Sequence, residues 1–133
     1  MAICKLLLIL AITGVQTQQG LNAVRVTDVR TAKEWLMFPG NPSGPAIRAK
    51  AGESLVIVEF AWTDKLTGKD TGEDLEGFEV EDLAGKVYKS PIAEGDVREA
   101  PFLVPAPNQL RFFRAGGMTV DISALARKLV TPK

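Results

Sequence analysis

Apolar and polar side chains alternate most clearly over residues 54–62, SLVIVEFAW. Val56, Val58, Phe60 and Trp62 occupy one set of alternate positions and are all large and apolar, whereas the other set grades towards polar. A period of two with one dominant apolar face predicts a β-strand. At roughly 3.3 Å per residue this strand spans about 30 Å, enough to cross one layer of a small sandwich. We expect it to be the central strand of the fold.

The segment before this strand contains a second alternating run. Residues 23–31 carry charge on one face, which favours a strand near a sheet edge. Thr31 and Glu34 have the spacing of a capping box, which favours a helical turn over the apolar residues 35–38. An extended strand is the alternative there, because Pro39 follows directly.

Two hairpins are predicted after the central strand. Residues 77–83 and 86–89 form the first, with a turn in which Gly85 takes a positive φ. Residues 108–114 and 118–122 form the second, around a glycine pair. The intervening residues 100–105 are bracketed by prolines, which indicates a short strand at an edge.

Two long connections complete this arrangement. Residues 39–53 contain three prolines with interleaved glycines, a composition that predicts a loop without a ladder of backbone hydrogen bonds. Residues 63–76 are polar and acidic, and predict a long, mobile connection between strands.

Short strands without a crossover helix predict an all-β fold, an antiparallel β-sandwich of about seven strands. One hydrophobic core is expected between its sheets. Its predicted members are Val24, Val26, Val56, Val58, Phe60, Trp62, Phe78, Val80, Phe102, Val104, Leu110, Phe112, Val120 and Ile122.

The N-terminal segment has the layout of a secretory signal peptide. Lys5 precedes an apolar run of about half the length that a membrane-spanning helix needs, and polar residues follow from Gln16. We expect residues 1–17 to be a signal peptide, with cleavage between residues 14 and 23, and residues 21–133 to be the domain. The exported protein would be periplasmic or extracellular, with no membrane span after cleavage.

Composition narrows the function classes. The chain has 16 basic and 16 acidic residues, so its net charge does not favour nucleic acid as a partner. It has no histidine, and its single cysteine, Cys4, lies in the predicted leader. The mature chain would therefore lack the commonest general base, a thiol nucleophile and the usual zinc ligands. We expect a protein that is not an enzyme and that has no cofactor and no catalytic residues.

Several segments also resemble a known family. The stretches AKAGESLVIVEFAW, EGFEVEDLAGKVY, FLVPAPNQLRFF and VDISAL, within about residues 50–125, resemble the telokin-like, immunoglobulin-like secreted domains, a family of unknown function. A glycine-led strand, a strand ending in an Asp-x-x-Gly turn and a phenylalanine-to-Val-Pro strand recur there in this order. This chain has Thr63 and Asp64 where the family has asparagine. The resemblance implies an immunoglobulin-like sandwich and export, and it assigns no site.

Two segments are candidate binding sites. Trp35 and Phe38 are the first and last residues of an apolar run beside the proline-rich loop. Aromatic side chains in such a run either anchor a partner or complete the core. The acidic loop carries Asp64, Asp70, Glu73 and Asp74, and its glycines and carboxylates make calcium an alternative to simple solvation. Its spacing does not match an EF-hand, and we predict no metal site.

The function expected from these features is binding. An exported adaptor domain would recognise a protein or cell-envelope surface through its loops. A carbohydrate-binding module that uses Trp35, Phe38 and Tyr88 is the alternative. A hydrolase based on Glu79 and Glu81 is the more distant one, because no flanking cleft residue is identified.

Overall fold

The protein folds as antiparallel β-sheets in the computed structural model, which describes residues 18–19, 22–38, 40, 43–64, 66–70, 75–92, 94–95 and 98–130. The described residues form two four-stranded sheets and two two-stranded ribbons. Two short helical segments, η1 (Pro107–Gln109) and α2 (Ser123–Ala126), complete them. The all-β prediction is confirmed. The predicted leader, residues 1–17, lies outside the described residues.

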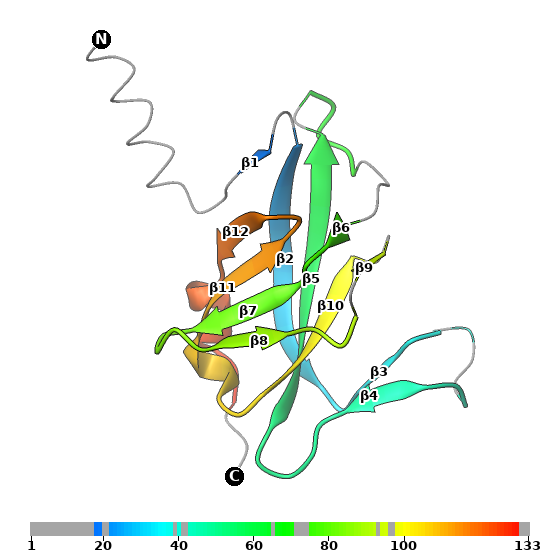
Figure 1. Cartoon of the computed structure of the whole chain (residues 1–133), viewed down its shortest axis with the longest axis vertical. Coiled ribbons are helices and arrows are strands. Elements are labelled where there is room, and N and C mark those ends of the chain that lie inside the picture. Colours follow the sequence, from blue (N-terminus) through cyan, green and yellow to red (C-terminus); the bar gives the residue numbers. More distant parts are fainter. Residues whose placement is uncertain are drawn as a thin grey trace.

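The first sheet has the order β1-β2-β5-β10 (Figure 1). Its strands are β1 (Gln18–Gln19), β2 (Asn22–Ala32), β5 (Ser54–Asp64) and β10 (Glu99–Val104). The strand predicted from residues 54–62 is central, because it pairs with β2 on one side and β10 on the other. The predicted edge position of β10 is also confirmed. At this edge Pro101 has no N–H, and its carbonyl accepts a hydrogen bond from Ser90 Oγ at 2.8 Å.

The second sheet has the order β12-β11-β7-β8 and contains both predicted hairpins. Its strands are β12 (Met118–Asp121), β11 (Leu110–Ala115), β7 (Glu79–Asp82) and β8 (Val87–Lys89). Gly85 has φ 87° in the β7–β8 turn, and Gly116 and Gly117 have φ 57° and 78° in the β11–β12 turn. Glycine adopts these angles without steric cost, which explains its place in both turns.

The two ribbons lie partly in segments predicted as loops, residues 39–53 and 63–76. The ribbon β3–β4 pairs Glu34–Leu36 with Ala46–Arg48, and β6–β9 pairs Leu75–Glu76 with Glu94–Gly95. The prediction that residues 39–53 form no ladder of backbone hydrogen bonds is therefore wrong at β4. The three residues of β4 follow Pro45, and each has a backbone N–H that can join a ladder. Of the alternatives for the apolar run after Glu34, the extended strand is correct.

The acidic connection is also more ordered than predicted. β5 continues to Asp64, and Thr63 forms an isolated bridge with Asp70. Asp64 N–H donates to the Lys69 carbonyl at 2.9 Å, and Gly68 N–H donates to the Asp64 carbonyl at 2.7 Å. These bonds join Asp64 to Gly68 and Lys69 and close a turn.

Register shifts change which side chains face the core. In β2 the pairing with β5 shifts after Val26, and Val29 is buried. In β11 the pairing with β7 shifts between Leu110 and Phe112, and Phe113 is buried instead of Phe112. The prediction that Phe112 belongs to the core is wrong. A β-bulge inserts one residue and reverses the inward alternation beyond it.

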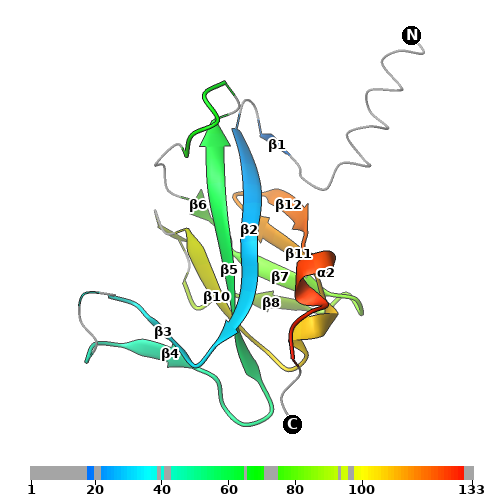
Figure 2. The ribbon, with the colours of Figure 1, turned by 180° about the vertical axis from the view of Figure 1, so that it is seen from behind.

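Both sheets contribute to one hydrophobic core. The Phe60 ring lies 5.6 Å from Phe78 and 5.2 Å from Phe113, centroid to centroid, which links β5 to the second sheet. Val26 and Trp62, both predicted core members, are partly buried and pack against this core. The remaining predicted members are buried: Val24, Val56, Val58, Phe60, Phe78, Val80, Phe102, Val104, Leu110, Val120 and Ile122. Helix α2 contacts β11 and β2 (Figure 2).

Candidate functional site

The β3–β4 hairpin projects from the side of the first sheet (Figures 1 and 2). Its ladder pairs Glu34 with Arg48 and Trp35 with Ile47, and Met37 N–H donates to the Pro45 carbonyl at 3.1 Å. Arg48 Nη2 lies 2.6 Å from Glu34 Oε2, so an ion pair reinforces the base of the hairpin. This ribbon presents the apolar run that the sequence identified as a candidate binding segment.

The apolar side chains of this run divide into two groups. Trp35 and Leu36 are half-buried against the body of the protein. Met37 and Phe38, beyond the end of β3, are 44% and 58% exposed. The run therefore has a half-buried part and an exposed part, and partner binding by its aromatic residues stays a prediction.

The hairpin lies beside the outward face of β5. This face is more buried than the sequence pattern predicted. Leu55 and Ile57 point away from the main core, yet each is 1% exposed. The prediction that β5 has one dominant apolar face is thus wrong for its first half. Both faces of a strand are buried where another element covers the outer side, and near Ile57 that element carries Trp35 and Leu36.

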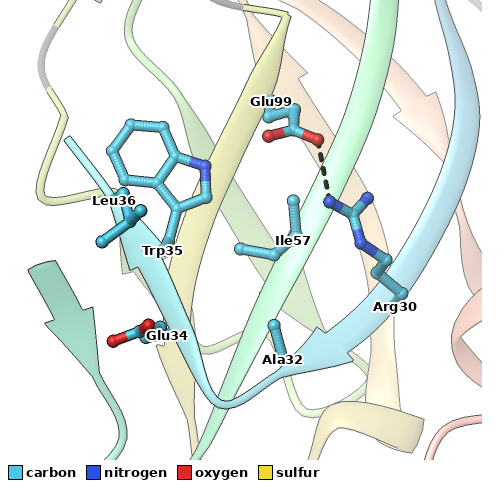
Figure 3. A pocket seen from close by; sticks show the side chains of 7 residues that line it. All are labelled: Arg30, Ala32, Glu34, Trp35, Leu36, Ile57 and Glu99. Carbon is cyan, nitrogen blue, oxygen red and sulfur yellow. Dashed lines mark hydrogen bonds and ion pairs between the residues drawn. The ribbon is translucent and has the colours of Figure 1, made fainter. Parts of the chain in front are cut away.

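A recess of about 230 Å³ lies between the hairpin and the sheet (Figure 3). Its apolar wall consists of Trp35, Leu36, Ala32 and Ile57. Its polar wall consists of Arg30, Glu34 and Glu99, from β2, β3 and β10. Three separate strands therefore supply its charged groups.

Arg30 is the centre of the charged wall. Its guanidinium lies 2.8 Å from Glu99 Oε2, 3.3 Å from Glu59 Oε2 and 3.8 Å from Asp28 Oδ2. The hydrogen bond from Arg30 to Glu99 raises the pKa of the guanidinium, against partial burial, and the three negative charges add to the rise. Thr27 Oγ1 donates to Glu59 Oε1 at 3.3 Å and helps to hold that carboxylate.

The acidic loop lies at the opposite end of β5 from the hairpin (Figure 1). Asp70 accepts two hydrogen bonds from Arg98, at 2.6 and 2.8 Å, and one from Trp62 N–H at 3.2 Å. Asp64 Oδ1 accepts the Leu66 N–H at 2.8 Å. These two aspartates thus stabilise the turn, and the structure does not bring them together with Trp35.

The calcium alternative for this loop gains no support from its described part. Glu73 and Asp74 lie outside the described residues. Within the residues that the structure describes, no group of three or more histidine, cysteine, aspartate or glutamate side chains is placed to hold a metal ion.

The glutamates considered for hydrolysis lie on the outer face of the second sheet. Arg114 contacts Glu81 at 2.7 Å and Glu79 at 3.5 Å, and its guanidinium also lies 5.8 Å from the Phe112 ring centroid. Tyr88, considered for sugar binding, lies on β8 of this sheet. Burial and the Asp82 carboxylate raise the Tyr88 pKa.

A second recess, of about 360 Å³, was not predicted from the sequence. It lies between the β7–β8 turn, η1 and α2, and its lining includes Leu83, Arg111, Asp121 and Arg127. Asp121 Oδ1 accepts hydrogen bonds from Ser123 Oγ at 2.6 Å and from Ser123 N–H at 2.9 Å. These bonds, with the nearby arginines, lower the pKa of the Asp121 carboxyl, against partial burial. The aspartate thus holds Ser123, the first residue of α2.

Comparison with known proteins gives no match: no family model, no curated protein and no solved structure matches the chain. The resemblance to the telokin-like secreted domains therefore stays a prediction. No helix among the described residues has the length and apolar composition needed to cross a membrane.

Proposed function

We propose that this protein is an exported, non-enzymatic binding domain with an immunoglobulin-like fold, which recognises a protein or cell-envelope surface through its β3–β4 hairpin. One observation carries the proposal. Met37 and Phe38 are 44% and 58% exposed at the tip of a hairpin that projects from the sheet (Figure 1). Adjacent exposed apolar side chains on a projecting element are typical of partner anchors.

The energetic reason is the burial of these side chains on binding. Complete transfer of a phenylalanine or methionine side chain from water contributes roughly 1.5 to 3 kcal/mol, and the half that is exposed here contributes about half of that. Two such side chains together supply about 2 kcal/mol, which corresponds to more than tenfold in affinity.

The absence of enzymatic activity is part of the proposal. The sequence has no histidine and no cysteine beyond Cys4. A glycosidase acid needs a carboxyl group in surroundings that keep it protonated. Glu79 and Glu81 instead lie against the Arg114 guanidinium. Export rests on the leader expected at residues 1–17.

A carbohydrate-binding module is a second candidate, because Trp35 lines a recess that also contains carboxylates. Stacking of a sugar ring on Trp35 would quench its fluorescence. Trp62→Phe removes the other tryptophan, which packs against the core, and so isolates the Trp35 signal. Saturable quenching by a glycan, with no captured protein, would favour this second candidate.

The test of the proposed function compares two variants of the full chain with matched changes in exposed apolar residues. Met37→Ser/Phe38→Ser changes the hairpin tip. Leu66→Ser changes a 77% exposed leucine in the turn at the other end of β5. Tagged proteins are used to capture partners from the envelope fraction of the native host. We expect the hairpin variant to lose its captured partner by about tenfold or more and the Leu66 variant to keep it.

The variants' unfolding transitions are measured in parallel. Equal capture by the wild type and the folded hairpin variant would contradict the proposal. Loss of capture in both variants would also contradict it, because the effect would then not be specific to the hairpin.

A further inference from the structure

We propose that the recess beside the β3–β4 hairpin receives one long cationic side chain, an arginine or lysine, from the protein partner. This inference rests on the proposed function and adds the chemistry of the group recognised. Three features carry it: the size of the recess, the negatively charged cluster at its edge and its aromatic wall.

The size of the recess fits one side chain of a larger partner. Its volume is about 230 Å³, below the roughly 300 to 1,000 Å³ of pockets that enclose a whole small ligand. The exposed Met37 and Phe38 adjoin the same hairpin and supply contact area outside the recess. A protein segment can use both surfaces at once, with one side chain inserted and its neighbours against the hairpin tip.

The charge beside the recess favours a cation. Arg30 and Glu99 line the recess, and Asp28 and Glu59 lie outside its lining but within 3.8 Å of the Arg30 guanidinium. This cluster therefore has one positive and three negative charges, a net charge of −2. Glu34, the other acidic group of the lining, is paired with Arg48, so this pair adds no net charge.

The hydrogen-bonding groups of the recess also favour a donor. Both terminal nitrogens of Arg30 already donate, Nη1 to Glu59 and Nη2 to Glu99. Within the described part of the chain, Glu99 Oε2 has this partner and Glu99 Oε1 has none. A guanidinium or ammonium group can donate to such an oxygen, whereas an anionic ligand that used the remaining N–H groups of Arg30 would lie beside the three carboxylates already paired with it.

The apolar wall suits the rest of a long cationic side chain. Lysine and arginine bury their methylene stems on apolar surface while the charged head reaches polar groups. Trp35, Leu36 and Ile57 provide that surface, and Figure 3 shows the Trp35 indole on one side of Ile57 and the Arg30 guanidinium, bonded to Glu99, on the other. Tryptophan is also the aromatic side chain that attracts a cation most strongly.

The first experiment uses the unaltered full chain and two blocked peptides as probes. One is acetyl-Ala-Leu-Arg-Leu-Ala-amide, and the other has citrulline, a neutral isostere, in place of arginine. Binding is measured by calorimetry and by two-dimensional NMR. We expect the arginine peptide to bind with a Kd of about 1 mM or tighter and the citrulline peptide to bind about fivefold more weakly. Raising the salt concentration should reduce this difference.

The second experiment compares Glu99→Gln with Glu81→Gln. Each change removes one carboxylate charge from a glutamate–arginine pair of nearly equal length, 2.8 Å for Glu99 and 2.7 Å for Glu81, but Glu81 lies on the other sheet. Glu99→Gln should weaken binding of the arginine peptide by about two- to fivefold, and Glu81→Gln should leave it unchanged. The Trp35 fluorescence of the Trp62→Phe protein should change more with the arginine peptide than with the same concentration of the citrulline peptide.

Equal binding of the arginine and citrulline peptides would overturn the inference. The absence of binding by either peptide, at a concentration about ten times the expected Kd of about 1 mM, would also overturn it. So would an equal effect of both glutamine variants, or quenching of Trp35 by a glycan in place of the cation. These results leave the proposed function intact if Met37→Ser/Phe38→Ser still loses the native partner. If that variant keeps the partner, the proposed function itself is wrong.

Discussion

Replacement of Gly116 by alanine tests how closely the β6–β9 ribbon packs on the second sheet. Gly116 has φ +57° in the β11–β12 turn, and a Cβ at this position would lie 2.6 Å from Leu75 Cδ2 on β6. Gly117, the next residue, has φ +78°, and a Cβ there would meet nothing within 4 Å. The close contact with Leu75 is therefore specific to Gly116, where Met118 Cε would also lie 3.5 Å from the added Cβ.

The expected losses of stability follow from this difference. Both alanine variants pay about 1 kcal/mol for a left-handed backbone conformation. Gly116→Ala must also displace Leu75, which is 4% exposed and has no free space towards solvent. Overpacking of a buried site costs about 1 to 3 kcal/mol. We expect Gly117→Ala to lower the free energy of unfolding by about 1 kcal/mol and Gly116→Ala by about 2 to 4 kcal/mol.

Urea unfolding followed by tryptophan fluorescence measures both changes, with the slope m checked for constancy. Leu75→Ala removes the obstructing side chain, so Gly116→Ala in that background should cost about 1 kcal/mol, as Gly117→Ala does. If Gly116→Ala and Gly117→Ala caused equal losses in the protein that keeps Leu75, then Leu75 would not pack on this turn. The placement of β6 would then be wrong.

Three further predictions concern single positions. Gly85→Val should lower the Tm by several degrees, measured by circular dichroism, because valine is strained at φ 87°; an unchanged Tm would contradict the turn geometry. Phe113→Ala should cost about 3 to 5 kcal/mol in urea unfolding, and Phe112→Ala about 1 kcal/mol or less, because Phe113 is 0% exposed; the reverse order would refute the bulge in β11. Asp121→Asn should cost about 0.5 to 1 kcal/mol at pH 7, because its hydrogen bonds from Ser123 lose the negative charge of the acceptor. Because the folded pKa of Asp121 is lowered, its stabilisation is present above pH 4 and is lost as the pH falls through the folded pKa; a variant difference that does not decrease as the pH falls below 4 would contradict this assignment.

The parts of the fold that the sequence predicted depend on local signals. The alternation over residues 54–62 and the glycines at 85, 116 and 117 each act within a few residues, and they correctly indicated the central strand and both hairpins. An alternating face or a left-handed turn needs no knowledge of distant contacts.

The parts that failed depend on partners distant in sequence. The bulge that brings Phe113 to the core is defined against β7, and nothing in the sequence around Arg111 requires it. Burial of Leu55 and Ile57 on the outer face of β5 depends on neighbouring elements, including the hairpin beside Ile57. β4 was missed because proline and glycine dominate the composition of its surroundings.

The candidate site was predicted in part for the same reason. Trp35 and Phe38 stand out as aromatic residues beside a proline-rich loop, and the structure places both on the hairpin. Arg30 and Glu99 lie 69 positions apart in the chain. They meet across β5 because the registers of β2 and β10 place Arg30 beside Ile57 and Glu99 beside Glu59. Their sequence neighbours carry no signal of this pairing.

The structure of the edges of the first sheet explains why we assign recognition to the β3–β4 hairpin. An exposed edge strand offers backbone groups to any extended chain, and proteins close such edges with proline, bulges and charge. Pro101 and the Ser90 hydrogen bond close the edge of β10, and β2 carries a register shift and a charged outward face. Pairing by backbone alone is thus discouraged on both sides of the first sheet. Specificity then has to come from side chains, and the hairpin is the element that combines exposed apolar residues with a charged recess.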